Sequence, residues 1–216
     1  MSRNTLIKIG NVDNSAEIFN KILPYVRIIY SVKQLEVLDA KDIILLFQGG
    51  EDINPSLYSE KSYLSPHEAS LSIRDTLEVD SFLYAKSFNI PMLGICRGSQ
   101  FLCAMSGGKL VQHVDGHTQS HNIQTNEGLS FVATSTHHQM MYPWGTKHNL
   151  IAWSSPKMAR HYIMSKGKTK DHLPAEPEIV FFEETKALGI QGHPEYNPPE
   201  HPYTMYCNRL VEEYLI

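Results

Sequence analysis

The sequence predicts an α/β fold in which a mostly parallel central sheet is covered by helices on both faces. Short apolar runs alternate along the chain with stretches whose hydrophobic residues recur with helical period. This alternation is typical of βαβ units, whose crossover helices pack on both faces of a parallel sheet. One apolar run also leads into a helix through a single residue, which predicts a sharp strand-to-helix turn at the edge of the sheet.

The first half of the chain supplies four expected strands and three expected helices. The strands cover residues 6–9, 26–30, 43–47 and 91–95. The helices cover residues 16–23, 70–88 and 100–105, and the last is expected to end at the glycine pair 107–108. The long helix offers a stripe for burial formed by Ile73, Leu77, Phe82 and Tyr84.

The second half is less regular. Residues 110–131 are polar and rich in histidine, without a clear period, and residues 165–171 are expected to be an exposed loop. A closing helix is expected at residues 203–215. The expected strands here are shorter and cover residues 131–134, 150–153, 179–182 and 187–191. Because no repeat, low-complexity tract or linker interrupts the pattern, a single domain spanning residues 1–216 is expected.

The net charge and the cysteine count indicate which partners and which cellular compartment to expect. The formal net charge is -4, whereas nucleic acids and anionic membranes call for clustered Lys and Arg. The three cysteines, Cys96, Cys103 and Cys207, are an odd number in a chain large enough to fold without disulfides. Free thiols in a reducing compartment are therefore expected. The first residues lack the apolar core of a signal peptide, and no stretch has membrane-spanning length, so a cytoplasmic protein is expected.

Cys96 stands between Gly94 and Gly98, where the fourth apolar run meets a helix. A turn this tight holds its central residue in a strained backbone conformation and requires small neighbours. The side chain then projects from the end of the sheet, and the polarity of a helix N-terminus favours the nucleophilic thiolate. On these residues alone, a buried structural cysteine beside two packing glycines explains the pattern equally well.

Two further segments supply the partners that a cysteine nucleophile needs. His193 and Glu195 follow an apolar run and would point to the same side of an extended segment, so the carboxylate can orient a basic imidazole. The glycine pair Gly49-Gly50 ends another apolar run and allows backbone N–H groups to approach an oxyanion. Read singly, the first segment is also compatible with a surface loop and the second with an ordinary turn.

Taken together, these segments resemble the class I glutamine amidotransferase superfamily, and in particular its gamma-glutamyl hydrolase-like branch, which includes the gamma-glutamyl-GABA hydrolases. The resemblance covers most of the chain, from about residue 45 to residue 195. Six segments carry it in the family's order: residues 49–55, Arg74-Asp75 with Glu78, residues 94–100, 107–112, 135–139 and 192–195.

The resemblance implies a flavodoxin-like three-layer sandwich with a nucleophile elbow. It implies Cys96 as the nucleophile, His193 as the base and Glu195 as the group that orients the base. Backbone N–H groups of Gly50 and Arg97 would form the oxyanion hole. The residues implied to contact the substrate are Gly49, Gln100, His137, His138 and Gln139.

The implied reaction is hydrolysis of a gamma-glutamyl amide through a cysteinyl thioester, with glutamate and ammonia or an amine as products and no cofactor. An alternative is that the chain is the glutaminase subunit of a two-protein amidotransferase and delivers ammonia to a separate synthetase. A binding protein without activity is disfavoured because no member of the implied triad is missing. Gly192 stands where the branch usually has an aromatic residue, and the first third of the chain is short, so a reshaped acceptor end of the pocket is expected.

Two polar clusters are interpreted conservatively. His113, His117 and His121 are spaced four residues apart, but Gly116 interrupts the segment, so a polar loop at the rim of the site is expected and no metal site. Arg74, Asp75 and Glu78 share one helical face, where a structural ion-pair network is the default.

Overall fold

The computed structural model describes residues 3–62 and 70–216 and is built around a nine-stranded sheet. Strands β2, β1, β3, β4 and β14 form a parallel half, and the strands that follow β14 in the sheet pair antiparallel. The sheet is mixed, and the α/β class and flavodoxin-like fold are confirmed. In sheet order the strands are β2 (Tyr25–Ile29), β1 (Thr5–Ile9), β3 (Ile43–Phe47), β4 (Met92–Ile95), β14 (Ala187–Ile190), β13 (Pro177–Phe182), β10 (His148–Ser154), β7 (His121–Thr125) and β8 (Ser130–Ala133).

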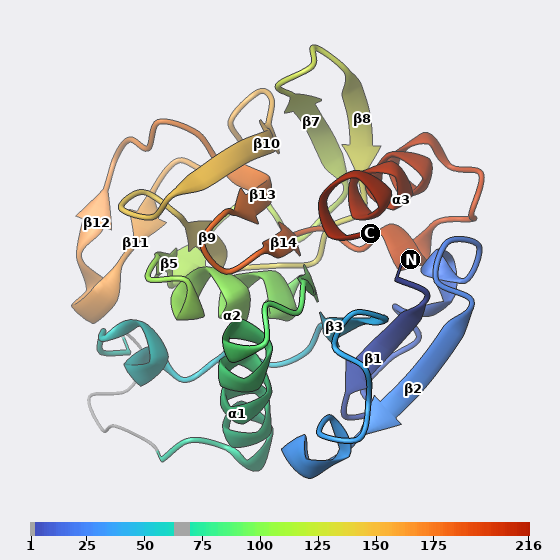
Figure 1. Cartoon of the computed structure of the whole chain (residues 1–216). Coiled ribbons are helices and arrows are strands. Elements are labelled where there is room, and N and C mark those ends of the chain that lie inside the picture. The colour runs from blue at the N-terminus through green and yellow to red at the C-terminus, as the bar shows by residue number, and fades with distance from the viewer. Residues whose placement is uncertain (1–2, 63–69) are drawn as a thin grey trace.

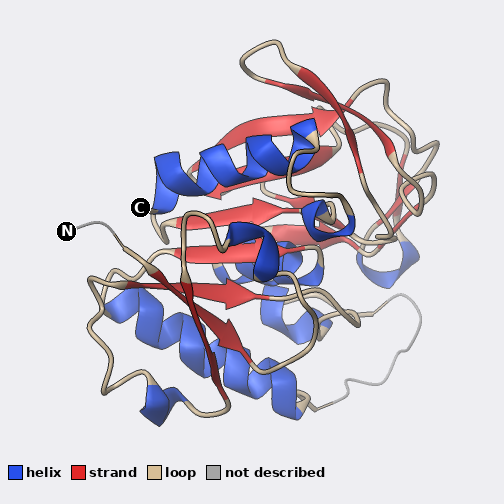
Figure 2. Cartoon of the chain, turned by 90° about the vertical axis from the view of Figure 1, so that its right-hand side faces the viewer, coloured by secondary structure: helices blue, strands red, loops and turns tan. Residues whose placement is uncertain are grey.

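Helices cover both faces of this sheet, as Figures 1 and 2 show. Helices α1 (Ile73–Ser87) and α2 (Arg97–Met105) lie on one face, and α3 (Pro202–Leu215) lies on the other. Successive strand residues point to opposite faces, so Leu6 joins the apolar core beneath α3, whereas Ile7 joins the core beneath α1 and α2. Every residue of β3 is buried, as expected for a strand covered on both faces.

Smaller elements complete the chain beside the main sheet. Strand β5 (Lys109–Val111) pairs with β9 (Met140–Tyr142), and β6 (His113–Val114), β11 (Tyr162–Ile163) and β12 (Thr169–Lys170) form a small sheet. The 3₁₀ helices are η1 (Glu17–Phe19), η2 (Val32–Gln34), η3 (Pro55–Tyr58), η4 (Ser165–Gly167) and η5 (Pro194–Tyr196).

The helix expected at residues 16–23 is wrong: only the three residues of η1 are helical there. Ala16, Phe19 and Leu23 are all buried, so the apolar spacing is real. The backbone, however, closes i to i+3 bonds such as Phe19 N–H to the Ala16 carbonyl, which is the 3₁₀ pattern. Pro24 disfavours helical geometry in the residue before it, so the segment ends as a turn.

The buried face of α1 also differs from the expected stripe. Ile73 is 92% exposed, whereas Phe82 is buried. The inner face of the first turns carries Asp75 and Glu78 instead, because both carboxylates pair with the buried Arg97. Ser72 caps the start of the helix, because its hydroxyl accepts from the Asp75 N–H at 2.9 Å.

Residues 110–131, expected to be irregular, contain strands β5 to β7 and the start of β8. In β7 the side chains of His121, Ile123 and Thr125 face inward and alternate with more exposed ones. Because two of these inward residues are polar, the period-two pattern is hidden when only hydrophobic residues are counted.

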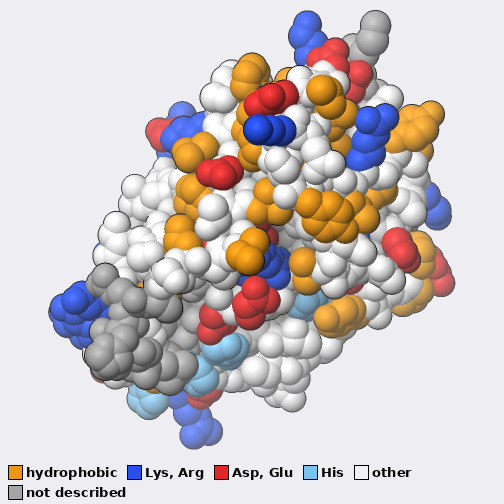
Figure 3. All heavy atoms as spheres, turned by 90° about the horizontal axis from the view of Figure 1, so that it is seen from below, with side chains coloured by type: hydrophobic (Ala, Val, Ile, Leu, Met, Phe, Trp, Pro, Cys, Tyr) orange, Lys and Arg blue, Asp and Glu red, His pale blue; other side chains and the backbone are white. Residues whose placement is uncertain are grey.

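The surface carries charges of both signs. Seen from below in Figure 3, Lys and Arg side chains are interspersed with Asp and Glu, and hydrophobic side chains lie in patches between them. Cys96, Cys103 and Cys207 are free thiols and all buried. Among the described residues, no helix combines the length and apolar character needed to span a membrane.

Candidate active site

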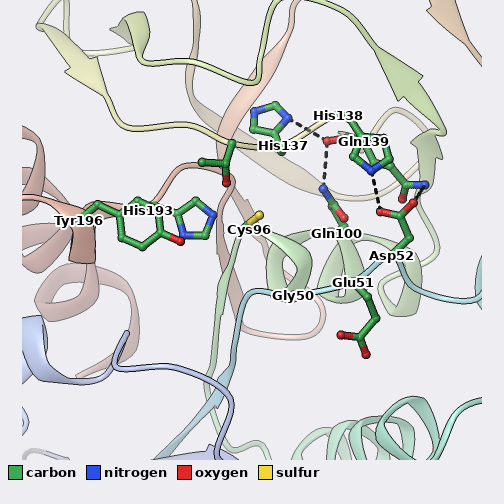
Figure 4. A pocket seen from close by; sticks show the side chains of 11 residues that line it. Gly50, Glu51, Asp52, Cys96, Gln100, His137, His138, Gln139, His193 and Tyr196 are labelled. Carbon is green, nitrogen blue, oxygen red and sulfur yellow. Dashed lines mark hydrogen bonds and ion pairs between the residues drawn. The ribbon is translucent and has the colours of Figure 1, made fainter.

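A polar cavity of about 500 Å³ opens at the carboxyl ends of the parallel strands β3, β4 and β14. This edge is where ligands bind in open α/β sheets. In Figure 4 the side chains of Cys96, Gln100 and His193 border the cavity, whereas that of Glu51 points away from it. The residues that line it are Gly50, Glu51, Asp52, Cys96, Gln100, Thr136, His137, His138, Gln139, His193 and Tyr196.

Cys96 is the single residue between β4 and α2, and its backbone is strained. Its φ of 50° and ψ of -109° lie in a region that L-residues rarely adopt. A Cβ on Gly94 would lie 2.5 Å from the Gly98 carbonyl oxygen, and a Cβ on Gly98 would overlap the Phe47 carbonyl. The two flanking glycines are therefore required for the turn, and the strand-to-helix turn predicted from the sequence is present.

The turn aims the thiol at an imidazole. Cys96 is 8% exposed at the cavity wall, its side chain lies beside the His193 ring in Figure 4, and the two side chains hydrogen-bond. A Cβ on Gly49 would lie 3.3 Å from His193 Cε1 and 3.9 Å from Cys96 Cβ, so Gly49 fills the space beside both groups. A side chain at this position would therefore press on the imidazole.

His193 follows β14 and is held from several sides. Its backbone N–H donates to the Thr134 carbonyl at 2.7 Å, and the Thr134 hydroxyl donates back to the His193 carbonyl at 2.6 Å. The ring Nδ1 contacts Glu195 Oε1 at 2.7 Å. Tyr196 stacks on the outer face of the imidazole with 4.4 Å between ring centroids and 2° between planes. These contacts fix the ring and leave Nε2 for the thiol.

The surroundings favour a charged imidazole at this position. Burial disfavours the imidazolium, but hydrogen bonds to Cys96 and Glu195, with their negative charges, outweigh burial and raise the pKa of His193 to about 10. An imidazolium whose other nitrogen faces a thiol is the arrangement of an activated cysteine nucleophile. The carboxylate orients the ring and supports its charge.

Arg74 holds the glycine turn that follows β3. Its Nη2 donates to the Gln48 and Gly49 carbonyl oxygens, both at 2.8 Å. The Gly49–Gly50 peptide is trans, so the Gly50 N–H points opposite to the Gly49 carbonyl and away from Arg74. Gly50 has a φ of 135°, a conformation that glycine adopts without strain.

The expected structural ion-pair network around Arg74, Asp75 and Glu78 is confirmed, and it includes Arg97. Arg97 is 1% exposed; its guanidinium donates to Asp75 Oδ1 at 2.7 Å and also pairs with Glu78. Glu78 accepts in addition from Arg74 Nε at 2.9 Å. The buried side chain of Arg97 thus ties the start of α2 to α1 and points away from the cavity. The backbone N–H of Arg97 is in the first turn of α2, next to Cys96.

Of the residues expected to contact substrate, Gln100, His137, His138 and Gln139 line the cavity, whereas Gly49 lies beside His193 and Cys96 without lining it. Gln100 Nε2 donates to the Gln139 carbonyl at 2.9 Å. The Gln139 side chain donates to Asp52 Oδ2 at 2.9 Å, and His138 Nε2 pairs with Asp52 Oδ1 at 3.2 Å. Asp52 thus links two of the expected residues, and desolvation by burial raises its pKa although His138 opposes the shift.

Asp52 and Tyr196 were not singled out as site residues from the sequence. Asp52 lies two residues after the Gly49-Gly50 pair at the carboxyl end of a strand, and Tyr196 lies three residues after His193. Proximity to a recognised motif at this edge of the sheet is the signal that could have identified both.

Two sequence interpretations are corrected by the structure. His117 and His121 do not lie at the rim of the site: they are 0% and 5% exposed, and the His117 ring packs against His137, which lines the cavity. The four-residue spacing of His117 and His121 therefore comes from polar side chains that point into the protein. Gly192 faces away from the cavity, because its Cβ would lie 2.5 Å from Tyr203 Oη and 2.8 Å from the Thr134 carbonyl. The aromatic ring of Tyr203 on α3 occupies the space into which a side chain at position 192 would point.

Comparison with known proteins gives one family match. The sequence model of the family described as Peptidase C26 matches residues 16–164, more than half of the chain. The matched range includes Cys96 and ends before His193 and Glu195.

The curated relatives are mostly distant. The chain is 37% identical over 79 residues to "Putative glutamine amidotransferase-like protein RP404" of Rickettsia prowazekii (37% of this chain, 28% of that one). It is 26% identical over 172 residues to "Putative glutamine amidotransferase-like protein YvdE" of Lactococcus lactis (70% and 65%). A third relative is one subunit of the glutamine-hydrolyzing GMP synthase of Picrophilus torridus, 23% identical over 133 residues (58% and 61%). The matches thus span less than two thirds of these relatives' own length.

Solved structures share the fold across the whole chain. A crystal structure of a protein described as a GMP synthase subunit, from Thermoplasma acidophilum, superposes with a TM-score of 0.58 at 14% identity, covering 99% of both chains. A glutamine amidotransferase from Thermotoga maritima gives a TM-score of 0.56 at 15% identity, covering 99% of this chain and 83% of that one.

Proposed function

Since the chain belongs to the peptidase C26 family of class I glutamine amidotransferase-like proteins, we propose that it hydrolyses a gamma-glutamyl amide bond through a cysteinyl thioester. The observation that carries the proposal is the strained turn that directs Cys96 at His193, whose ring is in turn held by Glu195 at 2.7 Å. The nucleophile, the base and the group that orients the base come from the ends of two neighbouring strands.

The chemistry follows from the charges of the three groups. The Cys96 thiolate attacks the side-chain carbonyl carbon, and the His193 imidazolium gives its proton to the departing nitrogen as the C–N bond breaks. Neutral His193 then takes a proton from water, the hydroxide attacks the thioester, and Cys96 leaves as thiolate. The products are glutamate and ammonia or an amine.

The negative charge on the tetrahedral intermediate needs donors that are already in place. We assign this role to the backbone N–H groups of Gly50 and Arg97. Support comes from Arg74, which holds the Gly49 carbonyl and so turns the Gly50 N–H the opposite way, and from the first turn of α2, whose N–H groups lack partners within the helix. Arg74 thereby acts as a positioning residue.

The polar walls of the cavity suit the amino-acid end of a gamma-glutamyl group. Asp52 offers a carboxylate for its ammonium, and Gln100, His138 and Gln139 offer polar groups for its carboxylate and carbonyl. His137 contributes the back wall. These residues set the glutamyl specificity in the proposal, and the leaving amine occupies the open side of the cavity.

A second candidate function is supply of ammonia to a separate synthetase. It is favoured by the similarity to the Picrophilus torridus protein, which is named as one subunit of a glutamine-hydrolyzing GMP synthase. In that case the same Cys96 chemistry releases ammonia from glutamine, and turnover depends on a partner protein.

An activity panel on the purified protein separates the two. Glutamine and several gamma-glutamyl amines are offered, and glutamate release is followed. Turnover of a gamma-glutamyl amine with little glutaminase activity supports the free-standing hydrolase. Activity that appears only after a co-purifying synthetase is added supports the ammonia-supplying role, and no glutamate from any substrate under either condition contradicts both.

Glu195→Gln is expected to move the alkaline limb of the pH–rate profile to lower pH. The carboxylate is one of the groups that raise the pKa of His193 to about 10, and without it the imidazolium loses its proton at lower pH, by about one unit or more. The profile of kcat/KM measures this. The exposed ion-pair residue Glu127→Gln is the control, and an alkaline limb identical to wild type would contradict the pairing.

Arg74→Met is expected to lower kcat about tenfold or more with a smaller change in KM, because the Gly50 N–H loses its fixed direction during the reaction. Steady-state kinetics with the best substrate of the panel measures the split between the two constants. Arg209→Met, which breaks a surface ion pair with Glu127, is the matched control. A fall in melting temperature with unchanged kcat would leave Arg74 a purely structural role.

A further inference from the structure

Three histidines converge on one carboxylate oxygen behind the cavity wall. Glu178 Oε1 lies 3.0 Å from His121 Nε2, 3.2 Å from His117 Nδ1 and 3.5 Å from His137 Nε2. All of these side chains are at most 1% exposed. The ligand atoms of His117, His137 and Glu178 all lie within 4.8 Å of one another. They come from separate segments, since His121 belongs to β7 and Glu178 to β13.

The second ring nitrogen of each histidine is already engaged with an acceptor. His121 Nδ1 bonds the Gln119 carbonyl at 3.0 Å, and His137 Nδ1 bonds the Gln139 carbonyl at 2.9 Å. His117 Nε2 bonds a carboxylate oxygen of Glu176 at 3.1 Å. Carbonyl and carboxylate oxygens only accept, so each of these nitrogens carries the proton. In a neutral ring the other nitrogen then presents its lone pair to Glu178.

Lone pairs directed at a carboxylate repel it unless a cation lies among them. His117 Nδ1, His137 Nε2 and Glu178 Oε2 are buried and make no hydrogen bond with any described residue. Buried polar atoms without a partner are costly, and buried carboxylates need a compensating charge. With neutral rings, one positive centre is therefore missing at the point where these atoms meet.

We propose that His117, His137 and Glu178 bind a divalent cation, Zn²⁺, and that His121 holds the Glu178 carboxylate beside it. Ligand atoms that surround tetrahedral zinc at 2.0–2.1 Å are about 3.3–3.4 Å apart, and the distances of 3.2 and 3.5 Å from Glu178 Oε1 to His117 and His137 bracket that edge. A set of imidazole nitrogens and one carboxylate oxygen suits zinc.

The surroundings match those of a metal-binding histidine cluster. Ligating histidines donate their second N–H to a carbonyl or carboxylate, which fixes tautomer and ring orientation. His117 and His137 both do so here. Glu176, the partner of His117, is itself held by the Met158 and Ala159 N–H groups at 2.8 and 2.9 Å and by the Tyr162 hydroxyl at 2.8 Å.

The site would stabilise the cavity wall. His137 lines the cavity, and the Gln139 carbonyl that accepts from its Nδ1 also accepts from Gln100 at 2.9 Å. Because the side chains of all three ligands are at most 1% exposed, a cation between them is closed to substrate. Its role is therefore to hold this wall in place while the reaction proceeds at Cys96.

The competing arrangement is a protonated network without metal. There, His117 and His121 carry the charge as imidazolium groups beside the two glutamates. His137 still faces Glu178 with a lone pair, because its Nδ1 proton is used by the Gln139 carbonyl. The two arrangements differ in metal content, which is measured directly.

The test uses the full chain, free of any affinity tag and purified without chelator, with metal quantified by mass spectrometry. About one zinc per chain is expected, and re-addition at a hundredfold excess over Kd should raise the melting temperature of the apo protein by about 5–10 °C. Cobalt in its place should give the intense visible bands of a tetrahedral site. Glu178→Gln and His117→Asn should each weaken zinc binding at least about tenfold. The exposed His161→Gln should bind zinc as wild type does.

Folded wild-type protein that binds neither added zinc nor cobalt would overturn the proposal in favour of the protonated network. Equal loss of zinc from His161→Gln and Glu178→Gln would also overturn it, because the metal would then be held elsewhere. If the cluster variants do not fold, the stoichiometry and cobalt spectrum of the wild-type protein decide.

Discussion

Cys96→Ala is expected to lower turnover of the best substrate by about a thousandfold or more while leaving the fold intact. The thiol is the atom that forms the thioester, so no other group on the chain replaces it in the proposed reaction. Alanine keeps the Cβ that the strained turn already accommodates, and the side chain that is shortened borders the cavity. Glutamate release and circular dichroism measure the two effects.

Cys103→Ala is the matched control on the same helix. Burial raises the pKa of the Cys103 thiol to about 12, so it stays protonated and unreactive at neutral pH. This variant should lose stability and keep its kcat. Cys96→Ala protein that turns over every substrate as fast as wild type would refute the mechanism.

Gly98→Ala is expected to destabilise the protein by about 3 kcal/mol or more. A Cβ there would overlap the carbonyl oxygen of Phe47 and lie 2.5 Å from its carbon. Phe47 is 0% exposed and belongs to β3, which pairs with strands on both sides, so its backbone has no room to withdraw. Relief is possible only by moving α2, which also displaces Cys96.

Chemical denaturation of Gly98→Ala, wild type and Gly128→Ala measures the effect. Gly128 has a φ of 83° and nothing within 4 Å of its Cβ position, so its replacement costs only the left-handed backbone strain of about 1–2 kcal/mol. Equal stability of the two variants would show that the close approach at Gly98 is not a constraint on the turn.

Much of the fold and site was predictable because the signals are local. The glycines around Cys96 predict the turn from sterics alone, and the two-residue spacing of His193 and Glu195 predicts that both side chains reach the same side. The ion pairs of α1 follow from the helical spacing of Arg74, Asp75 and Glu78. Their partner Arg97 could not be predicted in this way, because it lies on another helix.

The remainder depends on contacts between distant segments. The link from Asp52 to Gln139 joins residues 87 positions apart, and the convergence on Glu178 requires β7 and β13 to be placed in one sheet. Tyr203 of α3 occupies the space that a side chain at position 192 would need. Residue pattern along one segment carries no information on such pairings.

The central claim is that a covalent intermediate forms at Cys96. Rapid acid quench of the enzyme with its best substrate, followed by intact and peptide mass spectrometry, tests it most directly. The account predicts an added mass of one gamma-glutamyl group on the peptide that contains Cys96, released by hydroxylamine and absent from Cys96→Ala. Rapid product formation with no adduct on wild-type protein, or an adduct on another residue, would contradict it.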